Sequence, residues 1–183
     1  MKLFTKFIAF SLLMMAFSAM TLNGQSFSSS GSARSIEDQV RKKILMLPRY
    51  EIFDAIGYQV NGDTVTLTGK VRNSVNKKDA EKAVSRIAGV SRVVNEIEIL
   101  PVGGYDESIR VRLYEKIAGS GSLSRYMWEN DPSIRLIVDR GHVSIEGFVS
   151  TRGDYNSINI LAQGIPGVFS VTNNLAIDKE RVR

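Results

Sequence analysis

The stretch that decides the fold runs from Val65 to Ile99 and reads VTLTGKVRNSVNKKDAEKAVSRIAGVSRVVNEIEI. Shifted by 78 positions without a gap, it meets the stretch from Val143 to Ile177, VSIEGFVSTRGDYNSINILAQGIPGVFSVTNNLAI. Apolar residues and glycines coincide in this frame, and Gly69, for example, falls on Gly147. A fixed period of this kind indicates one supersecondary unit used twice. We therefore expect two small tandem modules.

Each unit predicts a hairpin, a helix and a final strand. Asn61-Gly62 is a strong hairpin signal because both residues tolerate a positive φ. Apolar residues then alternate from Val65 to Val71, which predicts a strand with one buried face. We expect a helix from about residue 73 to residue 88, closed by Gly89, and a last strand from Val93 to Ile99.

A further amphipathic helix precedes each unit. The first starts at a predicted serine cap, Ser35, and stops before Pro48, and the second starts with Asp106 near its cap. The predicted fold class is α+β: two tandem α-β-β-α-β modules, each a small three-stranded mixed sheet with two helices packed on one face. At about 70 residues each core is marginal, so we expect the two modules to lean on each other.

Charge and cysteine content exclude several functions. The net charge is +5, but residues 35 to 100 carry eleven basic and nine acidic side chains, and residues 105 to 183 carry ten of each. Nearly neutral modules do not suggest a nucleic-acid partner. Gly164-Ile-Pro-Gly167 spells the GxxG of RNA-binding KH domains, but here it joins a helix to a strand. The absence of cysteine excludes disulfides, thiolate metal sites and a cysteine nucleophile.

The N-terminus predicts export. Lys2 and Lys6 precede an uncharged run from residue 7 to residue 19, which has the length of a signal-peptide core. We assign residues 1–24 to a signal peptide, with cleavage after either Ser18 or Gly24, and residues 25–34 to a flexible linker. An uncleaved anchor is the competing interpretation. Both place the modules in the periplasm or outside the cell.

The repeated residues resemble the BON domain (bacterial OsmY and nodulation). In the first copy they are Asn61-Gly-Asp-x-Val-x-Leu-x-Gly-x-Val71 and Gly89-Val-x-x-Val-x-Asn95. In the second they are Gly141-His-Val-x-Ile-x-Gly-x-Val149 and Gly167-Val-x-x-Val-x-Asn173. The resemblance implies a non-enzymatic, often periplasmic module associated with phospholipid and envelope maintenance. It predicts BON domain 1 at 35–100, a linker at 101–105, BON domain 2 at 106–178 and a tail at 179–183.

Two groups of residues are candidates for contact with an anionic phospholipid membrane surface. The first is the aromatic-rich insertion of the second copy, since aromatic rings beside a cation suit a bilayer interface: Arg125, Tyr126, Met127 and Trp128. The second is the outer side of a helix in the first copy, where each cation contributes roughly 1 kcal/mol: Lys77, Lys78, Lys82 and Arg86. Core packing of the aromatics and a merely solvated helix face are the competing interpretations.

An alternative function is docking of another envelope protein. Ile137 and Phe148 put an apolar patch on the outer sheet face of the second copy, which needs a cover from the other module or from a partner. Catalysis has little support, because His142 is the lone histidine and Glu96 with Glu98 fits a solvated strand face. We expect no enzyme activity, cofactor, metal or small-molecule substrate. The leading hypothesis is an exported protein that binds anionic phospholipid and supports envelope integrity or stress tolerance.

Overall fold

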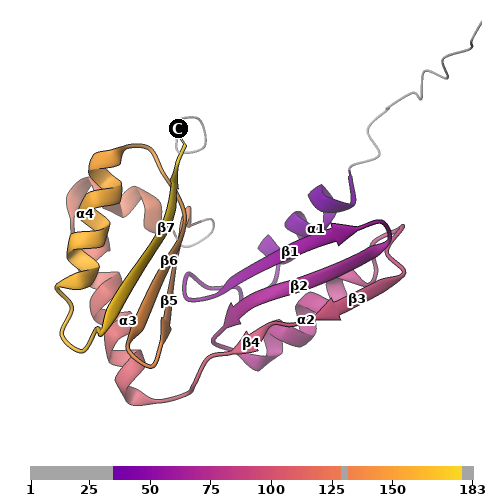
Figure 1. Cartoon of the computed structure of the whole chain (residues 1–183), viewed down its shortest axis with the longest axis horizontal. Coiled ribbons are helices and arrows are strands. Elements are labelled where there is room, and N and C mark those ends of the chain that lie inside the picture. The colour runs from indigo at the N-terminus through magenta and orange to yellow at the C-terminus, as the bar shows by residue number, and fades with distance from the viewer. Residues whose placement is uncertain (1–34, 129–131, 179–183) are drawn as a thin grey trace, which may run out of the picture. The chain divides into compact units, whose positions relative to one another are not determined.

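The computed structural model describes residues 35–128 and 132–178, which form two α+β modules and confirm the predicted fold class (Figure 1). The first module contains helix α1 (Ile36–Leu45), strands β1 (Ala55–Asn61) and β2 (Thr64–Val71), helix α2 (Ser74–Val84) and strands β3 (Arg92–Asn95) and β4 (Glu98–Ile99). The second contains helix α3 (Gly104–Ala118), a 3-10 helix η1 (Gly121–Met127), strands β5 (Ile134–Asp139) and β6 (His142–Val149), helix α4 (Arg152–Gln163) and strand β7 (Ser170–Ile177). The predicted signal peptide, the linker 25–34 and the tail 179–183 lie outside the described residues.

The two sheets share one topology. The first hairpin strand of each module pairs antiparallel with the second, which then pairs in parallel with the last strand. The registers agree with the 78-residue shift, because Val65 faces Val93 and Val143 faces Val171. In each module the helices lie on one face of the sheet (Figure 1), and the core is formed between them.

A glycine in the second hairpin strand of each module fixes how the strand passes its neighbour. Gly69 and Gly147 have φ angles of 107° and 115°, a region that favours glycine. A Cβ atom at either position would lie 2.1 Å from a backbone carbonyl oxygen, that of Ala55 or that of Ser133. The repeated glycine is therefore required by close backbone approach within the sheet.

The last strand of the first module differs from the prediction. It is interrupted between β3 and β4, although the N–H of Glu96 still donates to the carbonyl of Leu67 at 2.8 Å. Asn95 Nδ2 donates to the carbonyl of Lys77 on α2 at 2.9 Å, and Asn95 Oδ1 accepts from the N–H of Ile97 at 3.2 Å. Asn173 makes the equivalent bonds with Tyr155 and Leu175 in the second module, where β7 is assigned as continuous. The repeated asparagine ties the last strand to the helix above it.

The N-terminus of α3 also differs from the prediction. The residue before the helix is Gly103, which offers no side-chain cap, and the predicted linker residues Gly104 and Tyr105 already belong to α3. The buried carboxylate of Asp106 instead accepts from the N–H groups of Arg140 and Gly141 at 2.8 and 2.9 Å. Asp106 thus fastens the β5–β6 turn to α3.

Residues of the two modules contact each other through polar groups. The N–H of Leu136 donates to the carbonyl of Ile52 at 2.8 Å, and the guanidinium of Arg135 lies 4.3 Å from the ring centre of Tyr50. Lys70 forms an ion pair with Asp139. These contacts agree with the expectation that the modules lean on each other.

Candidate functional site

The aromatic-rich insertion of the second module is only partly at the surface. Its residues form η1, and the three-residue repeat of a 3-10 helix directs Leu123 and Tyr126 to the same side, into the core. Tyr126 is 0% exposed, and Met127 is buried as well. The prediction that Tyr126 and Met127 contact lipid is therefore wrong for the folded chain, because both belong to the hydrophobic core.

Tyr126 organises a polar cluster at the end of η1. Its hydroxyl donates to Asp154 Oδ2 at 2.8 Å and accepts from the N–H of Ser150 at 3.0 Å. Arg125 lies over the Tyr126 ring and pairs with Asp154 at 2.9 Å. Burial alone would raise the pKa of Asp154, but hydrogen bonds from Thr151 and Tyr126 and the charge of Arg125 hold that pKa below its ordinary value. The cluster fixes Arg125 at the surface as a cation.

Trp128 follows η1 directly and is 71% exposed. Arg125, Arg135 and the half-buried Phe148 line the same open groove as Trp128. We call Arg125, Trp128, Arg135 and Phe148 the Trp128 corner. An exposed indole on a groove that two guanidinium groups also line combines apolar area with positive charge, which is the chemistry that a bilayer interface accepts.

The patch predicted from Ile137 and Phe148 is not an open apolar surface. Ile137 is only 5% exposed, although it lies on the outer side of β5. Its neighbours on that side are Arg135 and Asp139, and both contact the first module. Ile137 is therefore unavailable to a partner in this structure, and only Phe148 remains as a partly exposed member of the predicted pair.

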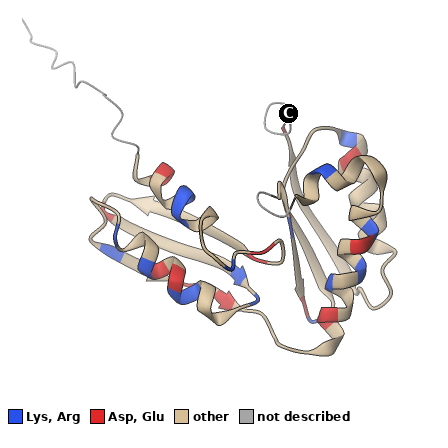
Figure 2. Ribbon diagram, turned by 180° about the vertical axis from the view of Figure 1, so that it is seen from behind, with Lys and Arg blue, Asp and Glu red and all other residues tan. Residues whose placement is uncertain are grey.

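The helix face predicted for lipid contact carries charges of both signs. Lys78, Lys82 and Arg86 are exposed and Lys77 is half-buried, and Figure 2 shows acidic residues interspersed with basic ones along α2. Glu81 on this helix accepts a hydrogen bond from Asn95 at 2.9 Å. Mixed charge weakens the attraction of this face to an anionic surface.

The buried polar side chains of Asp54 and Arg110 hydrogen-bond to neighbouring segments of the fold. Asp54 accepts from the N–H groups of Glu51 and Arg72 and from Asn76 Nδ2, at 3.1, 2.6 and 2.7 Å. Burial raises the pKa of Asp54 despite these donors. The buried guanidinium of Arg110 donates to the carbonyl of Val138 at 2.7 Å.

His142 lies on the surface, where its Nδ1 is 2.7 Å from Ser170 Oγ. Within the described ranges, no group of three or more histidine and acidic side chains is arranged to hold a metal ion. Over the same ranges, every helix is too short or too polar to span a bilayer.

The sequence interpretation missed a second exposed aromatic surface at the β5–β6 turn. Phe169 is 71% exposed and stacks on Tyr105, with ring centres 6.1 Å apart. The ring centre of His142 lies 6.0 Å from that of Phe169. The signal was available in the 78-residue alignment, which pairs Phe169 with Ser91 in the first module. It was overlooked because the rings come from three separate segments.

Comparison with known protein families decides the family. The model of the BON domain matches residues 32–101 and 105–179, well over half of the chain, in two tandem copies. The chain belongs to the BON-domain family. BON domains are generally non-catalytic binding modules, typically periplasmic or membrane-associated.

Solved structures add little beyond this. Two similar chains are described as the C-terminal domain of CdsD, the structural protein of the type III secretion system of Chlamydia trachomatis, and as CdsD from structural studies of the same system. They are 11% and 12% identical, with TM-scores of 0.32 and 0.28. Each match covers 80% of this chain and 99% or 95% of the other. Similarity at this level carries no argument about function, and no curated protein matches.

Proposed function

We propose that this BON protein acts in the periplasm or outside the cell, where it binds anionic phospholipid surfaces and supports envelope integrity or stress tolerance. Residues 1–24 would direct its export. The observation that carries the proposal is Trp128, the only tryptophan of the chain, which is 71% exposed on a groove that Arg125 and Arg135 also line. An indole exposed to this degree gains free energy when its ring enters the interfacial region of a bilayer.

The charges around Trp128 determine how strong the contact is. A cation near an anionic membrane surface contributes roughly 1 kcal/mol to the binding free energy. At about 0.1 M salt this attraction is largely screened beyond about 10 Å. Asp154 partly neutralises Arg125, and Arg135 is held over Tyr50 and by the carbonyl of Glu51. The corner therefore supports weak, reversible, salt-sensitive binding at the membrane surface. Lys78, Lys82 and Arg86 on the first module remain a second, weaker candidate for the same surface.

The native tryptophan provides the test. Fluorescence of the intact protein is measured while vesicles of phosphatidylglycerol or of phosphatidylcholine are added, and bound protein is counted by sedimentation. We expect the emission of Trp128 to shift to shorter wavelength with the anionic vesicles only, and added salt to reverse the shift. Trp128→Ser should reduce sedimentation, whereas Met46→Ser, which removes a comparably exposed apolar side chain from the first module, should not. Equal binding to both lipids, or no shift with either, would contradict the proposal.

Docking of another envelope protein is the alternative function, and one of the two residues that predicted it is buried. It was predicted from Ile137 and Phe148, and Ile137 is buried. Only Phe148 and the groove beside it support this function now. A protein partner retained in detergent by the parent chain, and lost with Phe148→Asp in a folded variant, would favour it over lipid binding.

A further inference from the structure

The turn between β5 and β6 carries a rigid aromatic surface that has no counterpart in the first module. We call Tyr105, Arg140, His142 and Phe169 the aromatic tip. The Tyr105 hydroxyl donates to the carbonyl of Gly167 at 2.7 Å, and the His142 ring is held by Ser170. Phe169 lies against Gly141, where a Cβ atom would approach its ring to 2.7 Å. The ring of Phe169 thus packs on Gly141 with one side, and the residue as a whole is 71% exposed.

Arg140 is held in an unusual conformation at this turn. Its φ angle is 52°, and it is the one non-glycine residue of positive φ among the described residues. The equivalent residue of the first module is Gly62, with a φ of 63°. A side chain in this region strains the backbone, and such strain persists where the surroundings enforce it. Asp106 enforces it here, because its carboxylate holds the N–H groups of Arg140 and Gly141.

The same corner of the first module is polar. Asp63 accepts hydrogen bonds from Ser91 and Thr64, and Ser91 occupies the position of Phe169. The two modules therefore differ at several positions of this corner at once. Where the first has Ser91 and Gly62, the second has the exposed ring of Phe169 and Arg140.

We propose that the aromatic tip is a second lipid contact, at which Phe169 enters the bilayer interface and Arg140 pairs with lipid phosphate. This inference rests on the proposed function and deepens it. The Arg140 side chain is 79% exposed, and its acidic neighbour Asp139, at 3.8 Å, already pairs with Lys70. Arg112 adds a further cation, since it bonds to the carbonyl of Pro166 in the loop that precedes Phe169. Aromatic rings beside guanidinium groups are favoured at membrane interfaces.

The shape of the tip favours a membrane over a protein partner. The exposed groups lie on a hairpin turn and an adjoining loop, and Phe169 and Tyr105 are more than half exposed there. Arg140 and His142 also line a small pocket together with Lys70 and Asp139. A stable protein interface buries about 800 Å² on each side, with some 20 to 30 residues. A turn that offers three rings and two arginines is small for that purpose, but it is sufficient for shallow contact with a flat surface.

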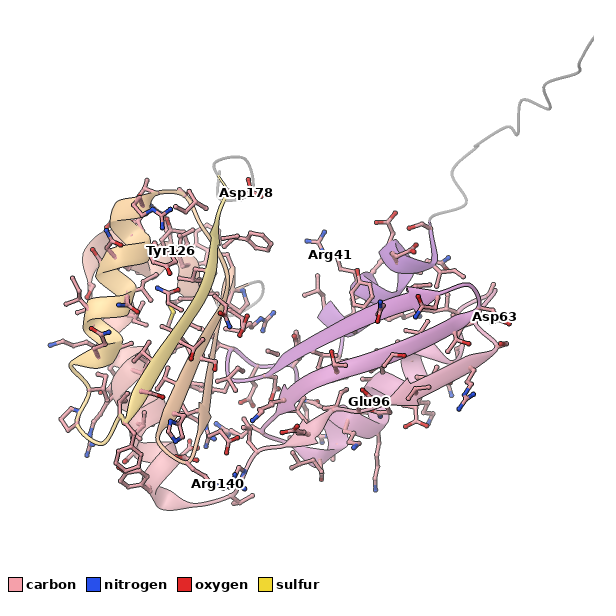
Figure 3. All side chains as sticks on the ribbon, in the orientation of Figure 1. Arg41, Asp63, Glu96, Tyr126, Arg140 and Asp178 are labelled. Carbon is pink, nitrogen blue, oxygen red and sulfur yellow. The ribbon has the colours of Figure 1, made fainter. Side chains whose placement is uncertain are left out.

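The tip is a separate site from the Trp128 corner. His142 begins β6 and Phe148 lies one residue before its end, so the two surfaces are roughly 20 Å apart at the usual rise per residue. Figure 3 shows Tyr126, whose ring lies under Arg125 of the Trp128 corner, and Arg140 towards opposite ends of the second module. A substitution at one site should therefore leave the other intact.

The test moves the fluorescent reporter. The protein with Trp128→Phe and Phe169→Trp carries its only tryptophan at the tip, and it is compared with the parent chain in the presence of phosphatidylglycerol vesicles. Trp128→Phe with Val111→Trp, on the exposed side of α3 midway along the module, is the matched control and should show no shift. We expect the tip reporter to shift to shorter wavelength and to be quenched by brominated lipid.

The outcomes separate the two proposals. A shift of the native Trp128 without a shift at the tip overturns the inference and leaves the proposed function standing. A shift at the tip alone supports the inference and moves the lipid contact away from the Trp128 corner. No shift at either position overturns both. A shift at the tip with polyglutamate but not with vesicles indicates an acidic protein partner, which also overturns the inference.

Arg140→Gln in the parent chain is a second variant that does not depend on the reporter. Loss of one interfacial cation should weaken sedimentation with phosphatidylglycerol vesicles about fivefold. Circular dichroism verifies that the variant is folded, which is expected because the Arg140 side chain is mostly exposed. Unchanged binding by the folded variant would overturn the role given to Arg140.

Discussion

The two modules have the same architecture, but the polar contact at the start of the second helix, α2 or α4, is made by different residues. In the first, the loop carboxylate of Asp54 meets the amide of Asn76 on α2. In the second, the residue equivalent to Asn76 is Asp154, and it meets the hydroxyl of Tyr126. In the first module the carboxylate comes from the loop before β1 and the neutral donor from α2. In the second module the carboxylate comes from α4 and the neutral donor from η1. The comparison teaches that both modules place a carboxylate against a neutral donor here, although different elements supply the two groups.

The largest effect is expected where the modules are most alike. Gly69→Ala and Gly147→Ala should each destabilise the protein by about 3–5 kcal/mol, because the Cβ atom would collide with a backbone carbonyl and the φ angle is unfavourable for alanine. Chemical denaturation of the two variants measures this loss. A loss below about 1 kcal/mol at either position would show that the sheets are not held as described.

The next prediction exchanges the corner of one module for that of the other. Asn76→Asp gives the first module the residue of the second, but Asp54 already provides a carboxylate 2.7 Å from that side chain. Two adjacent buried carboxylates repel, so we expect a loss of about 2–4 kcal/mol at pH 7 that is partly recovered on acidification. Thermal unfolding at pH 7 and pH 5 tests this. Equal loss at both pH values would argue against charge repulsion as the cause.

The dependence of stability on pH should also differ in sign between the modules. The pKa of Asp154 is lowered in the folded protein, so its stabilisation is present above the unfolded pKa of about 3.9 and is lost as pH falls through the folded pKa. The pKa of Asp54 is raised, so its contribution is greatest below about 3.9 and is lost as pH rises through the folded pKa. The stability difference between the parent chain and Asp154→Asn should therefore shrink on acidification below pH 4. The difference for Asp54→Asn should grow between pH 7 and pH 4, and the same trend for both would contradict the assignment.

The smallest expected change in stability is at the aromatic tip. Arg140→Gly installs the residue that the first module has at this place and relieves a strained φ angle. We expect a gain of about 0.5–1 kcal/mol, since the greater flexibility of glycine in the unfolded chain offsets part of the relief. Denaturant titration measures the gain. A clear loss of stability would mean that the Arg140 side chain holds the turn, which would weaken its assignment to binding.

Much of the fold could be predicted from the sequence because it depends on local patterns. Alternation from Val65 to Val71, the Asn61-Gly62 turn and the Ser35 cap each act through neighbouring residues, and the 78-residue repeat supplied the rest. The break between β3 and β4 could not be predicted in this way. The equivalent Asn173 makes the same bonds in a continuous strand, so the asparagine does not explain the break.

The candidate surfaces were harder to predict because they depend on which side of a short helix faces the core. Trp128 was predicted to contact lipid together with Tyr126 and Met127, with core packing as the competing interpretation. Only Trp128 of the three is exposed, since the 3-10 geometry of η1 is not visible in the residue pattern. The aromatic tip was missed because only the folded chain brings Tyr105, His142 and Phe169 together. Their proximity depends on contacts between segments that are distant in the sequence.

The central claim is that the second module makes the main membrane contact and that the first module contributes less. The most direct measurement is sedimentation of two folded double variants with phosphatidylglycerol vesicles at low salt. One variant, Trp128→Ser with Phe169→Ser, removes the exposed rings of the second module, and the other, Lys78→Glu with Lys82→Glu, reverses two charges on α2. We predict that the first variant loses most of its binding and that the second retains at least half. Retained binding by the first together with loss by the second would contradict the account.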